Sequence, residues 1–238
     1  MTKSKGQMTI DKFAELQKII NVKFRDPELL ETVFRHRSYV NEHKRDGGSN
    51  ERLEFLGDAV LELVVTEFLY KSYPKENEGT LTDWRSALVK GPHLADIAIE
   101  LQLGKYLYLS KGELMSKGRE KPYILANTVE ALIGAIYIDK GYKVAHGFIG
   151  KFILDRLPPI IEQGLHIDPK SRLQEITQEK MLGMPVYKVM KEEGPDHAKS
   201  FIVGVYVKDE LCGEGSGSSK QKAEQEAAKK GLKKKGWK

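Results

Sequence analysis

The sequence of 238 residues contains a single cysteine, Cys212, so it can form neither an internal disulfide nor a cysteine-based metal site. It has no apolar run long enough to span a bilayer, and residues 1–10 lack the apolar core of a signal peptide. None of the six histidines forms a His-x-x-x-His pair, which argues against a zinc site. These absences lead us to expect a cytoplasmic protein with no membrane association.

Charge is plentiful, and it is unevenly distributed along the chain. Residues 1–165 carry 24 Lys and Arg against 23 Asp and Glu, whereas residues 166–238 carry 15 against 11. Most of the net charge of +5 therefore lies in the smaller C-terminal part. A basic region of this kind fits a polyanionic partner, nucleic acid ahead of an anionic membrane, and it fits an ordinary solvated lysine-rich surface equally well.

The spacing of apolar residues changes near Pro158 and Pro159. Before them, from Ile10 to Leu157, apolar residues recur at helical spacing, which predicts an all-α region. After them, β-branched and aromatic runs alternate with turn residues and predict strands. The elements expected there are, in order, a helix at 172–181, strands at 186–190, 201–207 and 210–214, a Gly/Ser loop at 215–219, and a helix at 220–234.

This change in pattern predicts two domains of different class. We expect an all-α domain at 1–163, a linker at 164–169, and a small α+β domain of α-β-β-β-α order at 170–238. The order helix, three strands, helix in under seventy residues describes a compact module that can fold by itself.

A predicted helix from Glu51 to about Tyr70, with Asn50 placed to cap it, is apolar on most sides yet carries a stripe of carboxylates. Glu51, Glu54 and Asp58 lie at positions i, i+3 and i+7, where like charges repel and burial raises the cost of each ionised form. Two explanations fit this spacing. A divalent cation such as Mg²⁺ or Mn²⁺ neutralises the stripe, or arginines pair with it on a partly exposed helix face.

A second predicted helix, over 124–137, repeats the pattern. It is apolar nearly all round, with Asn127 and Glu130 at i and i+3 and small residues around Gly134 that would let another helix approach closely. The two helices could together form an all-oxygen metal site. The alternative is that Asn127 bonds to a neighbouring backbone group and that Glu130 pairs with an arginine.

The run Glu-Arg-Leu-Glu-Phe-Leu-Gly-Asp at 51–58 resembles the signature of ribonuclease III nuclease domains. The segments that extend this resemblance along the helical region are 36–39, 76–79, Gly104 and 124–139. The segments that resemble a double-stranded-RNA-binding domain are 172–175, 194–197 and 219–225. The similarity covers essentially the whole chain, in the right order and spacing.

The resemblance implies that Glu54, Asp58 and Glu130 hold Mg²⁺ (with Mn²⁺ as a substitute), and that Asp58 and Glu130 are catalytic. The fourth metal position of the family, usually Asp, is Asn127 here. An amide oxygen can still ligate a cation, but it removes one negative charge and accepts a proton poorly. Asn127 therefore fits an enzyme that works with an amide, or a variant made to retain uncleaved RNA.

The family pattern also implies a homodimer, in which each nuclease domain cuts one strand of an RNA duplex. Glu51 and Glu78 match secondary acidic positions. The expected products carry 5′ phosphates, 3′ hydroxyls and short 3′ overhangs, and the expected substrates are ribosomal and messenger RNA precursors. No residue has the motif context of a covalent nucleophile, and no small-molecule cofactor is implied.

In the C-terminal domain, the resemblance implies contacts with the minor grooves and phosphates of double-stranded RNA. Gln221 stands where Lys or Arg is usual, which would remove one phosphate contact. The residues expected to bind RNA are Gln174, Glu175, His197, Lys220 and Lys222.

Three functions compete. The leading one is a Mg²⁺-dependent endoribonuclease, and the first alternative is a double-stranded-RNA-binding protein whose cleavage is impaired by Asn127. The second alternative, a structural RNA-binding protein with an unrelated helical domain, leaves two acidic stripes unexplained.

Overall fold

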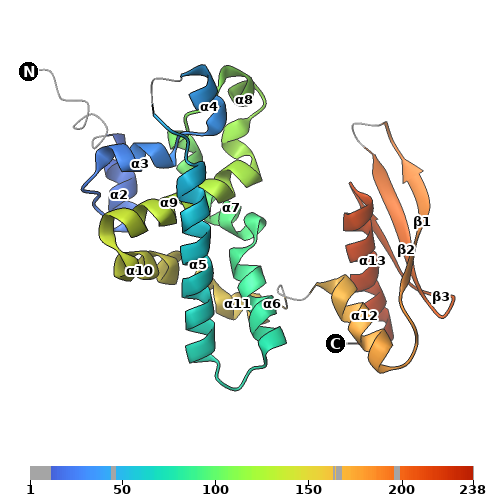
Figure 1. Ribbon diagram of the computed structural model, residues 1–238. Helices are drawn as coiled ribbons and strands as arrows, with labels where there is room; N and C mark the ends of the chain where they lie inside the picture. Colours follow the sequence, from blue (N-terminus) through green and yellow to red (C-terminus); the bar gives the residue numbers. More distant parts are fainter. Residues whose placement is uncertain (1–11, 44–46, 163, 165–167, 196–198, 238) are drawn as a thin grey trace, which may run out of the picture. The chain divides into compact units, whose positions relative to one another are not determined.

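The computed structural model describes residues 12–43, 47–162, 164, 168–195 and 199–237. The chain divides into two compact units, Met1–Gln163 and Gly164–Lys238, shown in Figure 1. In the described parts of both units, no helix combines the length and the apolar character needed to cross a membrane.

The first unit is helical throughout, apart from one isolated bridge between Arg35 and Tyr108. Its α-helices are α2 (Ala14–Ile20), α3 (Pro27–Val33), α4 (Arg37–Glu42), α5 (Glu51–Ser72), α6 (Glu78–Val89), α7 (Gly91–Glu100), α8 (Lys111–Met115), α9 (Pro122–Lys140), α10 (Tyr142–Phe152) and α11 (Leu157–Glu162). Short 3₁₀ turns lie at η1 (Leu103–Tyr106), η2 (Gly118–Glu120) and η3 (Leu154–Arg156).

Helix α9 forms the centre of this unit. It is buried on nearly every side and packs against α3, α5, α7 and α10 (Figure 1). This is the expected position for a helix that is apolar all round, because such a helix has no face that gains by meeting water.

Helices α5 and α9 cross with their backbones in close contact at Gly57 and Gly134. A Cβ atom on Gly57 would overlap the carbonyl oxygen of Glu130, and one on Gly134 would overlap the carbonyl oxygen of Leu53. Only glycine leaves room for this approach. The prediction that small residues around Gly134 admit another helix is therefore confirmed.

The beginning of α5 is held by Asn50 in a way that differs from the expected cap. The Asn50 side chain makes no capping bond; its amide donates instead to the carbonyl oxygen of Val33 at 3.0 Å, and its backbone N–H donates to Arg35 at 2.9 Å. Asn50 is the N-cap residue of α5, as predicted, but the expected side-chain capping bond is absent. The reason is that Asn50 is buried and its amide satisfies the free carbonyl at the end of α3.

The second unit places two helices on one face of an antiparallel sheet with strand order β1-β2-β3. Its elements are α12 (Pro169–Glu179), β1 (Val186–Glu193), β2 (Ser200–Val207), β3 (Glu210–Gly217) and α13 (Lys220–Lys235). Leu173, Val205, Cys212 and Ala227 pack in its core. The predicted fold classes, all-α followed by α-β-β-β-α, are both confirmed.

The expected Gly/Ser loop at 215–219 is wrong in its first half, because β3 continues to Gly217. A Cβ on Gly213, Gly215 or Gly217 would overlap the backbone of α13. These glycines therefore let α13 lie directly on the strand, so that they act as packing residues instead of loop residues. Ser219 caps α13 as predicted, with its Oγ accepting from the N–H of Lys222 at 3.3 Å.

Candidate functional site

The α5–α9 crossing brings together four oxygen-bearing side chains, named here the oxygen cluster: Glu54 and Asp58 on α5, and Asn127 and Glu130 on α9. Glu54 and Asp58 lie one turn apart on α5, and Asn127 and Glu130 lie three residues apart on α9, so each pair shares a helix face. Because Gly57 touches the backbone of Glu130, these two faces meet. The two stripes predicted from the sequence thus belong to one site.

Electrostatic coupling shows that the carboxylates of the cluster affect one another. The pKa of Glu130 is raised to about 7, first by burial and then by the negative charges of Asp58 and Glu54. The pKa of Glu54 is also raised, mainly by burial, while hydrogen bonding from the Asn127 amide partly opposes the rise. Within the described residues, no positive side chain offsets the effect at Glu130. The alternative in which Glu130 pairs with an arginine is therefore not supported.

The donor set suits a hard divalent cation, since it consists of three carboxylates and one amide oxygen. In the part of the chain that the structure describes, however, no three or more His, Cys, Asp or Glu side chains gather closely enough to hold a metal ion. The cluster fits such an ion by its chemistry and by its excess of negative charge, which among the described residues is offset only at Glu54, by Arg37. Its carboxylates do not converge on one point that a metal ion could occupy.

A cavity of about 280 Å³ opens beside the cluster. Glu54 and Asn127 line one side of it, and Glu51 lies at the beginning of α5 on the same cavity. The Glu51 carboxylate accepts from the Ser49 hydroxyl at 2.8 Å and lies 3.8 Å from the Arg37 guanidinium. Glu51 therefore belongs to the surroundings of the cluster, as the sequence predicts for a secondary acidic residue.

Glu78 lies elsewhere. It begins α6, beyond the C-terminal end of α5 (Figure 1), where it lines a separate cavity of about 680 Å³ with Tyr70 and Arg85. At 1.5 Å per residue, the length of α5 between Glu54 and Ser72 is about 27 Å. Within one chain, the structure does not bring Glu78 to the oxygen cluster.

The sequence reasoning gave no role to three further side chains at the cavity: His36, Arg37 and Tyr123. His36 and Arg37 belong to the 36–39 segment, which contributes to the resemblance to the family but has no role assigned from the sequence. Tyr123 precedes the second acidic stripe in the sequence and is 56% exposed. Because α4 and α9 are far apart along the chain, no local pattern places these residues beside Glu54.

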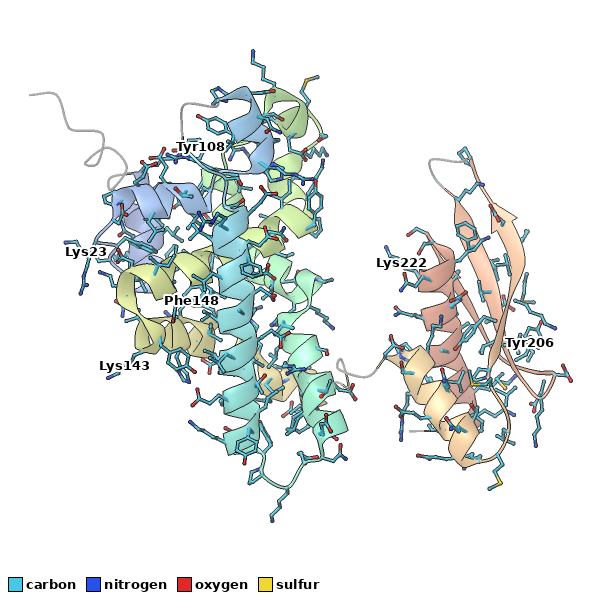
Figure 2. The ribbon with its side chains drawn as sticks, viewed as in Figure 1. Lys23, Tyr108, Lys143, Phe148, Tyr206 and Lys222 are labelled. Carbon is cyan, nitrogen blue, oxygen red and sulfur yellow. The ribbon has the colours of Figure 1, made fainter. Side chains whose placement is uncertain are left out.

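The predicted RNA-binding residues of the second unit lie on its helices. Gln174 and Glu175 are exposed on α12, and Lys220 and Lys222 are exposed on the first turn of α13. Figure 2 labels Lys222 on α13, whereas Tyr206 points away from this helix on the other face of the sheet. The remaining predicted residue, His197, lies outside the described residues.

Gln174 shares a cavity of about 310 Å³ with Gln221, so the first turns of α12 and α13 approach each other there. The Lys222 ammonium lies 3.4 Å from the Ser218 hydroxyl and forms no ion pair with the residues that the structure describes. Glu175 accepts from Arg172 at 3.2 Å. The surface is thus polar, exposed and positively charged at the α13 end.

Comparisons with known proteins agree with this geometry. Residues 26–157 match a family model described as Ribonuclease-III-like, and residues 169–235 match the double-stranded RNA binding motif. Ribonuclease 3 of Pelotomaculum thermopropionicum is 45% identical over 223 residues, which is 93% of this chain and 92% of that protein. Ribonuclease 3 of Desulfotalea psychrophila is 48% identical over 223 residues, covering 94% and 92%.

Solved structures agree as well. The nuclease domain of ribonuclease III from Campylobacter jejuni is 38% identical, with a TM-score of 0.57, and the match covers 61% of this chain and 99% of that chain. The fold and these matches define a helical nuclease joined to a double-stranded-RNA-binding module. The chain belongs to the ribonuclease III family. It is an endoribonuclease that cuts double-stranded RNA and depends on a divalent metal ion.

Proposed function

We propose that cleavage is centred on Glu54, Asp58, Asn127 and Glu130, with Mg²⁺ as the natural ion and Mn²⁺ as a working substitute. The observation that carries this proposal is the excess of negative charge at the α5–α9 crossing, where burial and two neighbouring carboxylates raise the pKa of Glu130 and no positive side chain among the described residues opposes the rise. A protein tolerates such repulsion where a cation relieves it. Oxygen donors, with no histidine or cysteine among them, favour Mg²⁺ over zinc.

When bound, a divalent ion supplies an activated water and relieves negative charge on the phosphate that is attacked. The chain's own residues orient the attacking water and the RNA strand. Asp58 and Glu130 accept hydrogen bonds from the attacking water and align it with the phosphorus atom. Glu54 and Asn127 fix the side of the cavity from which the strand enters. The products are 5′ phosphates and 3′ hydroxyls.

The same proposal includes a homodimer formed through α5. This helix carries an exposed apolar stripe at helical spacing: Phe55 is 81% exposed, Leu63 58% and Tyr70 75%. Side chains of this size gain when they are removed from water, and a second copy of α5 presents the same stripe to them. The Campylobacter jejuni nuclease domain is described with a region involved in dimer formation. Two sites that cut opposite strands at offset positions leave short 3′ overhangs.

In such a dimer, Glu51 and Glu78 serve as secondary acidic groups along the path of the RNA. Gln174 and Glu175 contact a minor groove, while Lys220 and Lys222 contact phosphates, with His197 assigned to a neighbouring groove by sequence alone. The exposed positions of the four described residues support these roles. The substrates in this proposal are duplex parts of ribosomal and messenger RNA precursors.

A cytoplasmic location belongs to the same proposal. It is supported by the state of Cys212, the single cysteine of the sequence, which is buried as a free thiol.

The deciding experiment is cleavage of an end-labelled RNA duplex in Mg²⁺ by this chain, beside its Asn127→Asp and Glu130→Gln variants. We expect cutting by the chain as it stands and faster cutting by Asn127→Asp, because a carboxylate adds one negative charge for the cation. Cutting restored only by Asn127→Asp would establish the alternative, a binding protein disarmed at one position. Equal cutting by Glu130→Gln would overturn the assignment of the cluster.

A further inference from the structure

The cavity beside the oxygen cluster has a lip that the cleavage chemistry does not use. Its residues are His36 and Arg37, at the beginning of α4, which line the cavity together with Glu54 and Asn127. Helix α4 lies beside α8 at the end of the unit where α5 begins (Figure 1), and the Lys111 N–H on α8 donates to Glu42 on α4 at 3.3 Å. A strand that occupies this cavity therefore lies against His36 and Arg37 as well as against Glu54 and Asn127.

The hydrogen bonds of His36 fix which ring nitrogen carries the proton. Its Nδ1 accepts from the backbone N–H of Ser38 at 3.3 Å and lies 2.8 Å from the Ser38 hydroxyl. The Ser38 oxygen in turn accepts from the N–H of Ser110 at 3.1 Å, so its own hydrogen is available to Nδ1. A nitrogen that accepts carries no hydrogen, which leaves the proton on Nε2.

The neutral form of this ring dominates at neutral pH, because burial lowers the pKa of His36 against a smaller opposite effect of Glu113. No hydrogen bond to Nε2 is found among the residues that the structure describes. His36 is thus a neutral, oriented N–H donor at a cavity wall.

Arg37 is the positive group of the lip. Its side chain is 70% exposed, and its nearest guanidinium nitrogen is 3.8 Å from Glu51, which is itself 55% exposed. An ion pair that is so open and so long contributes little, so the guanidinium can exchange Glu51 for a stronger anion at small cost. Arginine also offers paired donors that match a phosphate.

We propose that His36 and Arg37 bind one backbone phosphate of the RNA strand that enters the oxygen cluster, with His36 Nε2–H and the Arg37 guanidinium donating to its non-bridging oxygens. The inference rests on the proposed cleavage site. It explains how a polyanion is brought up to a cluster of negative side chains, since the lip supplies one positive charge and one donor at the point of entry.

A purely structural role is the competing explanation for His36, because its Nδ1 caps α4. Two substitutions separate the roles. His36→Asn keeps a good capping side chain but cannot reach into the cavity. His36→Gln places an amide N–H₂ near the position of Nε2 and loses the cap.

The experiment measures kcat/KM for a short duplex in Mg²⁺, with the full-length chain and with thermal unfolding of each variant as a control. We expect His36→Asn to lose about ten- to hundredfold, as for a lost hydrogen bond to a charged group, and His36→Gln to stay within about threefold. Arg37→Gln should lose about tenfold, with most of the loss recovered in Arg37→Lys. Wild-type rates for His36→Asn, or a loss in His36→Gln alone, would overturn the proposal for His36.

A second arm identifies the phosphate itself. Duplexes that carry one neutral methylphosphonate at successive positions are cleaved by the wild type and by His36→Asn. The methylphosphonate and the His36→Asn substitution should be non-additive at one position near the scissile bond. In the duplex that carries the methylphosphonate there, His36→Asn should cut as fast as the wild type. Additive losses at every position would exclude a phosphate contact by His36. Failure of the wild type to cut any duplex would instead refute the proposed cleavage function, so the two failures are distinguishable.

Discussion

The two units face the same polyanion with opposite designs. In the nuclease unit, Glu54 and Glu130 are half-buried and Asp58 is exposed, on two helices whose backbones touch at Gly57 and Gly134. In the C-terminal unit, Lys220 and Lys222 are exposed at the start of one helix, and the core beneath them does not use them. Under the proposed assignments, cleavage is coupled to the packing of its unit, whereas duplex binding is carried by side chains that the core does not use.

The largest effect that this contrast predicts is at Glu130. Replacement by Gln should lower cleavage by about a thousandfold or more, because the cluster loses a charge, while duplex binding in EDTA is unchanged. The same replacement should raise the unfolding temperature of the nuclease unit in EDTA by roughly 2–4 °C, since repulsion with Asp58 and Glu54 is relieved. Activity assays and calorimetry check both. A lower unfolding temperature would contradict the account of the cluster.

The second-largest effect is expected for Gly57→Ala. Its added Cβ would overlap Glu130 at the crossing, which costs about 1–3 kcal/mol or more and moves the two halves of the site apart. The matched control is Gly147→Ala in α10, where no atom lies within 4 Å of the new Cβ and helix propensity favours Ala by about 1 kcal/mol. Urea unfolding and duplex cleavage measure the difference. Equal free energies of unfolding for the two variants would show that the crossing can accommodate a Cβ atom at position 57.

A smaller effect is predicted for the exposed face of α5. Phe55→Glu should shift the protein from dimer to monomer by sedimentation, because a charge cannot be buried between two copies of the stripe. Met115→Glu is the control, since Met115 on α8 is 87% exposed and lies outside the stripe. A dimer that persists in Phe55→Glu would place the interface elsewhere.

The smallest effect concerns the C-terminal unit. Joint replacement of Lys220 and Lys222 by Gln should weaken duplex binding and flatten its salt dependence by roughly one unit of log–log slope for each lost phosphate contact. Lys229 and Lys230, further along the same helix, provide a control with the same change in net charge. Thermal stability should not change in either double variant. If replacement of Lys229 and Lys230 weakened duplex binding equally, the RNA would be held by the net positive charge of the helix and not by the positions of Lys220 and Lys222.

The sequence predicted those parts of the fold that local periodicity determines. The all-α and α-β-β-β-α classes followed from apolar spacing, and Ser219 as a cap followed from its position before a helix. The side-chain bond of Asn50 and the 215–217 segment were misjudged, because burial against α3 and close packing under α13 are tertiary effects that no local window contains.

The candidate site, too, could be predicted only in part. Spacing alone showed that Glu54 and Asp58 share a face, as do Asn127 and Glu130, and small residues hinted that the two helices meet. Their meeting point, at the backbone of Glu130, depends on tertiary packing. The lip formed by His36 and Arg37 could not be derived from spacing, because its position follows from how α4 docks beside α5.

The close crossing of α5 and α9 also has a consequence for biosynthesis. Its two glycines are separated by five intervening helical segments, so the contact forms only after that long loop closes. A nascent polypeptide that ends before α9 holds Glu54 and Asp58 but lacks the other half of the site. On the proposed assignment of the cluster, a partly synthesised chain cannot cleave RNA before α9 has been made.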